Sequence, residues 1–281
     1  MWKRPTRALL VLAAAALGAG GAGQAEKMAL SVSPPLIEMA VAQGGDRSLQ
    51  VTLTNDGDKA FEARAEVVDL ILDEEGNPVV KPAGTSRWSL ARWVTLSNGQ
   101  VSVLPGQQKT VRCRVRVPLG QTGGRYGAVL FTAERNVPLS GSGMRFETRT
   151  GTVVMLTVAH TERRKAEVSG FRVQRGEGGD LLFEITLHNT GNAHLRASGE
   201  LLVRDATSNR VLRRVRLEGG TGTVLPEGTR RFSARVSRSR IPPGAYRAQV
   251  RFSAPGLSAV AGQTEFDVRE DGEIAVKPSV R

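Results

Sequence analysis

Three histidines are the side chains of this sequence best suited to acid–base or metal chemistry, and their surroundings argue against both. His188 and His194 flank the turn Asn189-Thr-Gly191, and His160 lies further upstream. No cysteine or carboxylate stands at metal-ligand spacing around them, and a zinc site needs three or four ligands. We therefore interpret the three as solvated loop histidines and expect no bound metal.

An acidic stretch, Asp73-Glu-Glu-Gly-Asn77-Pro78, offers oxygen ligands without the spacing that calcium needs. A calcium loop places oxygens at alternate positions and ends in glutamate, and this stretch does neither. We expect the tip of a hairpin here.

Cys113 is the only cysteine, so no intramolecular disulfide can form. It lies in Val111-Arg-Cys-Arg-Val-Arg-Val117, where strict alternation places it on the apolar face of a strand with the valines. We predict a buried, unreactive thiol, because an apolar environment disfavours the thiolate.

Motifs that bring a nucleophile together with its base are missing. The sequence has no Gly-x-Ser-x-Gly elbow, no phosphate-binding loop and no His-Glu-x-x-His pair. We therefore predict that the protein is not an enzyme and that it has no catalytic residue and no cofactor.

One pattern occurs twice in the chain. The pattern has three parts in a fixed order: an alternating apolar stretch that ends in Asn-x-Gly, a Leu-Pro turn, and a strand that begins at Gly-x-Tyr. It occurs at Asn55, Leu104 and Tyr126 and again at Asn189, Leu225 and Tyr246. The two asparagines lie 134 residues apart but the two tyrosines only 120, so the first copy has 14 extra residues, around Glu74 to Gln100. Two similar modules therefore follow one another.

Both modules are expected to be all-β, because short segments of alternating apolar and polar residues are separated by Gly, Pro and Asn. About seven strands per module are typical of an immunoglobulin-like β-sandwich. The expected strands are Leu30–Glu38, Ser48–Asn55, Phe61–Asp73, Trp93–Ser97, Thr110–Pro118, Arg125–Glu134 and Thr150–Ala159, then Ala166–Val173, Leu181–Asn189, Ala197–Asp205, Arg210–Leu217, Gly228–Val236, Tyr246–Ser253 and Gln263–Arg269.

Two repeated residues have structural interpretations. Tyr126-x-Ala128 and Tyr246-x-Ala248 have the spacing of the tyrosine corner, in which the hydroxyl bonds back to the backbone. Asn55 and Asn189 are typical turn residues, because asparagine can bond its own backbone while the following Gly accepts positive φ.

The chain begins with features of an export signal. A basic head precedes an apolar stretch and a run of small residues, so we expect a signal peptide over residues 1–25. The remainder divides into sandwiches over residues 26–162 and 163–270, joined by a short charged linker at Thr161–Lys165, and a polar tail over 271–281. No later segment is long and apolar enough to span a membrane. We expect a protein of the periplasm, the cell surface or the extracellular space.

The chain is basic, with a formal net charge of +12 that becomes +9 without the leader. Arg112, Arg114 and Arg116 lie on one face of a strand because side chains alternate. They form either a solvated face or a patch for a polyanion such as an anionic cell-wall polymer. Nucleic acid is not expected as a partner, because an exported protein rarely meets it.

A succession of short motifs resembles known envelope proteins. The motifs are Trp93-Val-Thr-Leu-Ser97, Val103-Leu-Pro-Gly-Gln107, Val115-Arg-Val-Pro118 and Gly123-Gly-Arg-Tyr-Gly-Ala-Val129. This succession resembles the N-terminal domain of bacterial WxL-interacting surface proteins and, more loosely, that of periplasmic pilus chaperones. The resemblance implies a non-enzymatic protein that binds another component of the cell envelope.

Two functions follow as expectations. The first is an exported scaffold that recognises an envelope protein or cell-wall polymer through its sandwich surfaces. The alternative is a periplasmic chaperone that binds pilus-type subunits by β-strand addition.

The strand that could carry such binding is Thr152–Val158, which is apolar on both faces. As an edge strand it would lend its main chain to a partner, with Val153 and Met155 as contact residues. As a central strand it would be sealed within the sheet. Before it lies Arg135–Thr148, which we expect to be a long loop.

Overall fold

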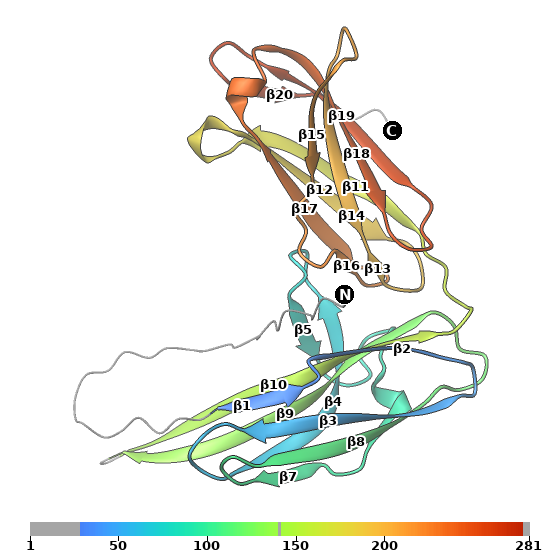
Figure 1. The fold of residues 1–281 in the computed structure, drawn as a ribbon, viewed down its shortest axis with the longest axis vertical. Helices are drawn as coiled ribbons and strands as arrows, with labels where there is room; N and C mark the ends of the chain where they lie inside the picture. Colours follow the sequence, from blue (N-terminus) through green and yellow to red (C-terminus); the bar gives the residue numbers. More distant parts are fainter. Residues whose placement is uncertain (1–28, 140–141, 278–281) are drawn as a thin grey trace, which may run out of the picture.

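The computed structural model describes residues 29–139 and 142–277, which consist mainly of strands. Two sandwiches meet at an angle, so the chain is bent (Figure 1). The helical elements of the described residues are three short 3-10 turns, η1 (Ala91–Trp93), η2 (Glu177–Gly179) and η3 (Arg238–Arg240). None of these is long and apolar enough to cross a bilayer. The predicted all-β fold of two immunoglobulin-like sandwiches is confirmed.

The first module packs two sheets face to face. One sheet has the order β1-β3-β8-β6, and the other has the order β2-β10-β9-β4-β5, with β7 also paired to β4. The strands are β1 (Leu30–Ser33), β2 (Leu36–Val41), β3 (Asp46–Asn55), β4 (Phe61–Leu72), β5 (Pro78–Lys81), β6 (Val94–Leu96), β7 (Gln100–Val103), β8 (Gln108–Arg116), β9 (Gly124–Leu139) and β10 (Ser142–Val158).

The core of the first module follows from the period-two pattern of its strands. In β8 the alternate residues Val111, Cys113 and Val115 are buried, while the arginines between them are exposed. Phe131 and Leu156 meet them from the opposite sheet. Burial raises the pKa of Cys113 to about 11, so the expectation of an unreactive thiol agrees with its environment.

Because of this thiol, the free energy of unfolding depends on pH in the alkaline range. Because its folded pKa lies above the ordinary value of 9.0, the unfolded chain loses the proton first, and stability falls as pH rises from about 9 to about 11. Between pH 8 and pH 10 the free energy of unfolding should fall by about 1 kcal/mol less in Cys113→Ala than in wild type. Urea unfolding at both pH values measures this, and identical losses in the two proteins would contradict it.

The second module has its own pair of sheets. Their orders are β11-β12-β17 and β15-β14-β18-β19-β20, and β13 and β16 form a separate two-stranded ladder. The strands are β11 (Ala166–Arg175), β12 (Leu181–Asn189), β13 (Leu195–Arg196), β14 (Ser198–Asp205), β15 (Val211–Arg216), β16 (Thr223–Val224), β17 (Thr229–Val236), β18 (Gly244–Ser253), β19 (Val260–Val268) and β20 (Ile274–Val276).

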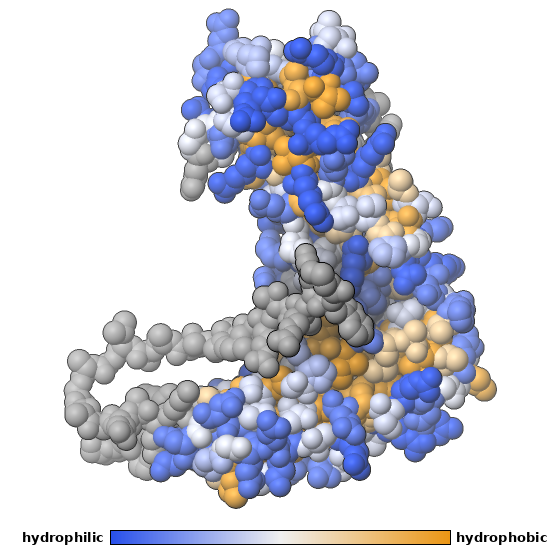
Figure 2. All heavy atoms as spheres, viewed as in Figure 1, coloured by the Kyte–Doolittle hydropathy of each residue, from blue (hydrophilic) through white to orange (hydrophobic). Residues whose placement is uncertain are grey.

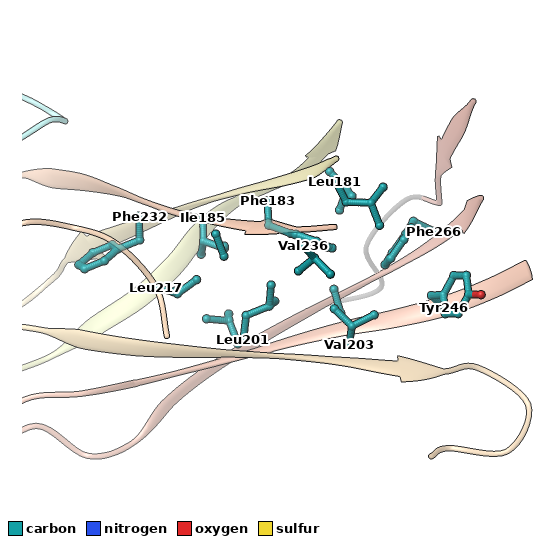
Figure 3. Packing of buried hydrophobic residues seen from close by; sticks show 14 of the residues in the cluster. Leu181, Phe183, Ile185, Leu201, Val203, Leu217, Phe232, Val236, Tyr246 and Phe266 are labelled. Carbon is teal, nitrogen blue, oxygen red and sulfur yellow. The ribbon is translucent and has the colours of Figure 1, made fainter. Parts of the chain in front are cut away.

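Aliphatic and aromatic side chains together fill the core of the second module (Figure 3). Phe183 and Phe266 pack edge to face with centroids 5.6 Å apart. Tyr246 lies beside Phe266, and its hydroxyl donates to the carbonyl of Pro242 at 2.5 Å. The hydroxyl thus bonds to the backbone four residues upstream, and the predicted tyrosine corner is present in this module.

The two asparagines of the repeated pattern form the same buried network in both modules. Asn55 donates to the carbonyls of Lys59 and Val103 at 2.8 and 3.1 Å, and its Oδ1 accepts from the Gly57 N–H at 2.9 Å. Asn189 donates to Ala193 and Val224, both at 2.9 Å, and accepts from Gly191 at 2.9 Å. The interpretation as turn residues is confirmed, and the duplication extends to individual hydrogen bonds.

Three expected elements differ from the structure. The single strand Leu30–Glu38 is split at Pro34 and Pro35, because proline has no N–H for a ladder, and the chain changes sheets there. Most of the expected loop Arg135–Thr148 instead continues the strands β9 and β10, and residues 140–141 of it lie outside the described residues. The expected polar tail includes β20, which pairs with β19.

Candidate partner-binding site

The strand Thr152–Val158 is central, so the structure has the second of the two alternatives that the sequence left open, an edge strand or a central one. Val153–Val158 pairs with β2 in parallel on one side and with β9 on the other. The alternating pattern could not show this, because it says which faces are buried and not which strands lie alongside.

Met155 joins the two modules. It is 6% exposed and packs with Leu70, Tyr126 and Leu225, the last of which belongs to the second module. Val153 lies on the same face and is only partly buried against this cluster. The two predicted contact residues are thus close together, but Met155 has its apolar surface covered by the other module.

Tyr126 does not form a tyrosine corner. Its hydroxyl accepts a hydrogen bond from the backbone N–H of His194 in the second module at 2.7 Å. Its ring is fully buried, and burial raises the pKa of the phenol. The same residue type at the same place in the repeat therefore has different roles in the two modules.

His194 is largely, though not fully, covered at this junction, which contradicts its interpretation as a solvated loop histidine. Its side chain is 14% exposed, and Nε2 lies 3.5 Å from Glu38 Oε1. Burial lowers its pKa, opposed mainly by the charge of Glu38. Arg196 donates to the same carboxylate at 2.5 Å. Within the described residues, no group of three or more histidine, cysteine or carboxylate side chains could hold a metal ion.

The extra segment of the first module makes a second contact with the other module. The acidic stretch forms the tip of the β4–β5 hairpin, and Arg231 of β17 donates to Glu74 at 2.5 Å and Glu75 at 2.8 Å. The Arg231 N–H also donates to the Glu74 carbonyl at 2.7 Å. Further along, Arg87 pairs with Glu227 at 2.7 Å. The extra segment of the first module, which has no counterpart in the second, thus holds the two modules together.

The basic face predicted for the first module lies on β8. Arg112, Arg114 and Arg116 are all exposed on one side of the strand. Arg114 donates to Asp46 Oδ2 through Nε at 2.6 Å, and this hydrogen bond lowers the pKa of the carboxyl. The three side chains share a face as expected, and their role in binding stays a prediction.

An edge without a hydrogen-bonded strand does exist, earlier in β10 than the segment considered from the sequence, although β1 lies close to β10. Among the described strands, β2 covers β10 only from Val153 onward, and no other strand pairs with that side. The Val153 N–H donates toward β2, to the Pro35 carbonyl at 3.0 Å. Because successive residues of a strand direct their backbone groups to opposite sides, those of Glu147, Arg149 and Gly151 face the same uncovered side.

Pairing with β9 continues along this whole length of β10, from Ser142 to Thr157. The free edge therefore belongs to a hairpin that is anchored in the sheet and projects from the module (Figure 1). Hydrophobic residues gather on the first module next to the bend (Figure 2). An uncovered edge of this kind can pair with a strand of another protein.

Comparisons with known proteins found similar solved structures. No family model and no curated protein sequence matches the chain. Among solved structures, the class 5 fimbriae chaperone CfaA has 13% identity and a TM-score of 0.46, with 90% of this chain and 100% of that one covered. The Pseudomonas aeruginosa CupB2 chaperone has 12% identity and a TM-score of 0.41, with 88% and 97% covered.

A third match is the CsuC–CsuE chaperone–tip subunit pre-assembly complex from chaperone-usher Csu pili of Acinetobacter baumannii, with 13% identity, a TM-score of 0.42, and 88% and 97% covered. These three matches are pilus chaperones or a complex that contains one, which overturns the main prediction of an envelope scaffold. None of the three supports the resemblance to WxL-interacting proteins. Only the looser resemblance is supported. Because the TM-scores lie below 0.5, we base the function on the geometry of this chain.

Proposed function

We propose that this protein is an exported, non-enzymatic chaperone that binds a pilus-type subunit by β-strand addition, with the edge of β10 before Val153 as the donor. The observation that carries this proposal is the uncovered side of an otherwise well-paired strand, with the backbone groups of Glu147, Arg149 and Gly151 on that side. Main-chain hydrogen bonds supply the affinity in such complexes. The periplasm is the compartment in which we place this activity.

The bend between the modules supports a role in holding a partner. Contacts at the Met155 cluster, at Glu38 and at the acidic hairpin fix the second module relative to the sheet that contains β10. A fixed arrangement reduces the entropy lost when a partner binds.

Replacing Arg149 with proline should weaken subunit binding without unfolding the module. Proline removes an N–H that faces the uncovered side, and strands tolerate proline where that side is unpaired. Arg149→Ala is the matched control, because it loses the same charge and the same ion pair with Glu147 but keeps the N–H.

The measurement is the soluble yield of a fimbrial subunit that lacks its last strand, diluted from denaturant in the presence of each protein. We expect wild type and Arg149→Ala to keep this subunit soluble and Arg149→Pro to lose at least about tenfold in apparent affinity, equivalent to ~1.4 kcal/mol. Equal protection by the two variants, at equal thermal stability, would rule out strand addition at this edge.

A further inference from the structure

A small polar concavity lies in the second module and is built only from residues of that module, whereas the edge of β10 belongs to the first. Its volume is about 190 Å³. Polar groups reach it from β13, from the ends of β14 and β15 and from the turn that follows β15, namely Arg196, Ser198, Arg216, Gly220 and Thr221. Phe232 and Leu217 of the core lie at its base and give it a firm floor.

Two arginine residues line this concavity from different strands. Arg196 is the last residue of β13, and one of its nitrogens binds Glu38, which leaves other N–H groups of its fork for a ligand. Arg216 is the last residue of β15 and is exposed. Arg214, two residues earlier, forms an ion pair with Glu200 at 3.5 Å. Within the described part of the chain, Arg216 has no ion pair.

The turn beside the arginines offers backbone donors. Gly222 N–H donates to the Gly219 carbonyl at 3.0 Å and closes the turn. Gly220 has a φ of 57°, a conformation that glycine adopts without strain. In residues 29–139 and 142–277, neither Gly220 nor Thr221 has an acceptor for its backbone N–H. Successive N–H groups at such a turn are a common way to bind an anion.

A third guanidinium lies directly behind the turn. Arg230 is 5% exposed and donates through Nη2 to the Gly219 carbonyl at 2.7 Å. Its Nε and Nη1 have no hydrogen-bond partner in the described residues, although Asp73 and Glu75 are close enough to act on it electrostatically. No carboxylate is bonded to it, and its positive charge, partly offset by Asp73 and Glu75, lies beside the turn through the bond to Gly219.

We propose that this concavity binds a phosphate group, held by Arg196 and Arg216 and by the N–H groups of Gly220 and Thr221. Two guanidinium forks and two backbone donors, with the hydroxyls of Ser198 and Thr221, offer more donors than the two oxygens of a carboxylate can use. A phosphate group presents three or four oxygens and suits arginine forks. This site is independent of the strand-addition function.

Inorganic phosphate is the probe, titrated into the full chain at constant ionic strength. Backbone amide NMR follows the signals of Gly220 and Thr221, and acetate is titrated in parallel. The test variant is Arg216→Gln. Arg214→Gln is the matched control, because it removes the same charge from the same exposed strand outside the concavity.

We expect saturable shifts at Gly220 and Thr221, and an affinity for phosphate that falls about tenfold in Arg216→Gln but less than about twofold in Arg214→Gln. If glycerol phosphate binds more tightly than inorganic phosphate, the natural ligand is a phosphate ester. If the two bind equally, the natural ligand is the free phosphate anion. The proposal is overturned if no shift saturates, if both variants weaken binding equally, or if acetate binds as tightly as phosphate.

Discussion

Asn189→Ala is expected to lower the free energy of unfolding of the second module by about 3 kcal/mol or more. The side chain is fully buried, and its amide donates to two carbonyls and accepts one N–H. Alanine removes the donor to the carbonyls of Ala193 and Val224 in an apolar surrounding, at roughly 1–3 kcal/mol each before any water enters. The Gly191 N–H keeps the Lys165 carbonyl as its acceptor at 3.1 Å. Such a loss is a large fraction of the stability of an ordinary domain.

Urea unfolding followed by near-ultraviolet circular dichroism measures this loss. Thr190→Ala is the control, because its side chain is exposed one residue further along the same turn. We expect the control to stay within about 0.5 kcal/mol of wild type. Asn55→Ala should weaken the first module by a similar amount, since its network is the same. A change below about 1 kcal/mol for Asn189→Ala would show that the network is not needed.

Met155→Arg is expected to separate the two modules while leaving each of them folded. The residue is 6% exposed in the small cluster between modules, so arginine would place an unpaired charge against Leu70 and Leu225. An uncompensated buried charge costs about 3–5 kcal/mol. The cores of the two modules do not include Met155, so we expect the interface to open before either sandwich unfolds.

Small-angle X-ray scattering and calorimetry test this expectation, with a larger radius of gyration and two separate unfolding transitions as the result. Val153→Arg is the matched control: it lies on the same strand and face two residues earlier, but it is only partly buried, so its charge can reach water. The expectation is contradicted if the two variants have the same radius of gyration, or if Met155→Arg unfolds the first module. In either case the Met155 cluster does not hold the modules together in the way described.

The sequence by itself determined the parts of this protein that depend on local pattern. Alternation in Val111–Val117 predicted the burial of Cys113 and the exposed row of arginines, because the two faces of a strand are set by period two. The repeated Asn-x-Gly predicted the two turns, because the asparagine side chain bonds to backbone within a few residues.

Tertiary structure decided everything that depends on which strands are neighbours. Tyr126 and Tyr246 occupy equal places in the repeat, yet only Tyr246 bonds within its own module, since the other hydroxyl meets a backbone N–H of the second module. The strand Thr152–Val158 is central because β2 lies beside it. The edge without a paired strand lies upstream of Val153, which is opposite Leu36, the first residue of β2. Alternation is a property of one strand, whereas an edge is a property of the sheet, and only the folded arrangement of strands far apart in sequence defines it.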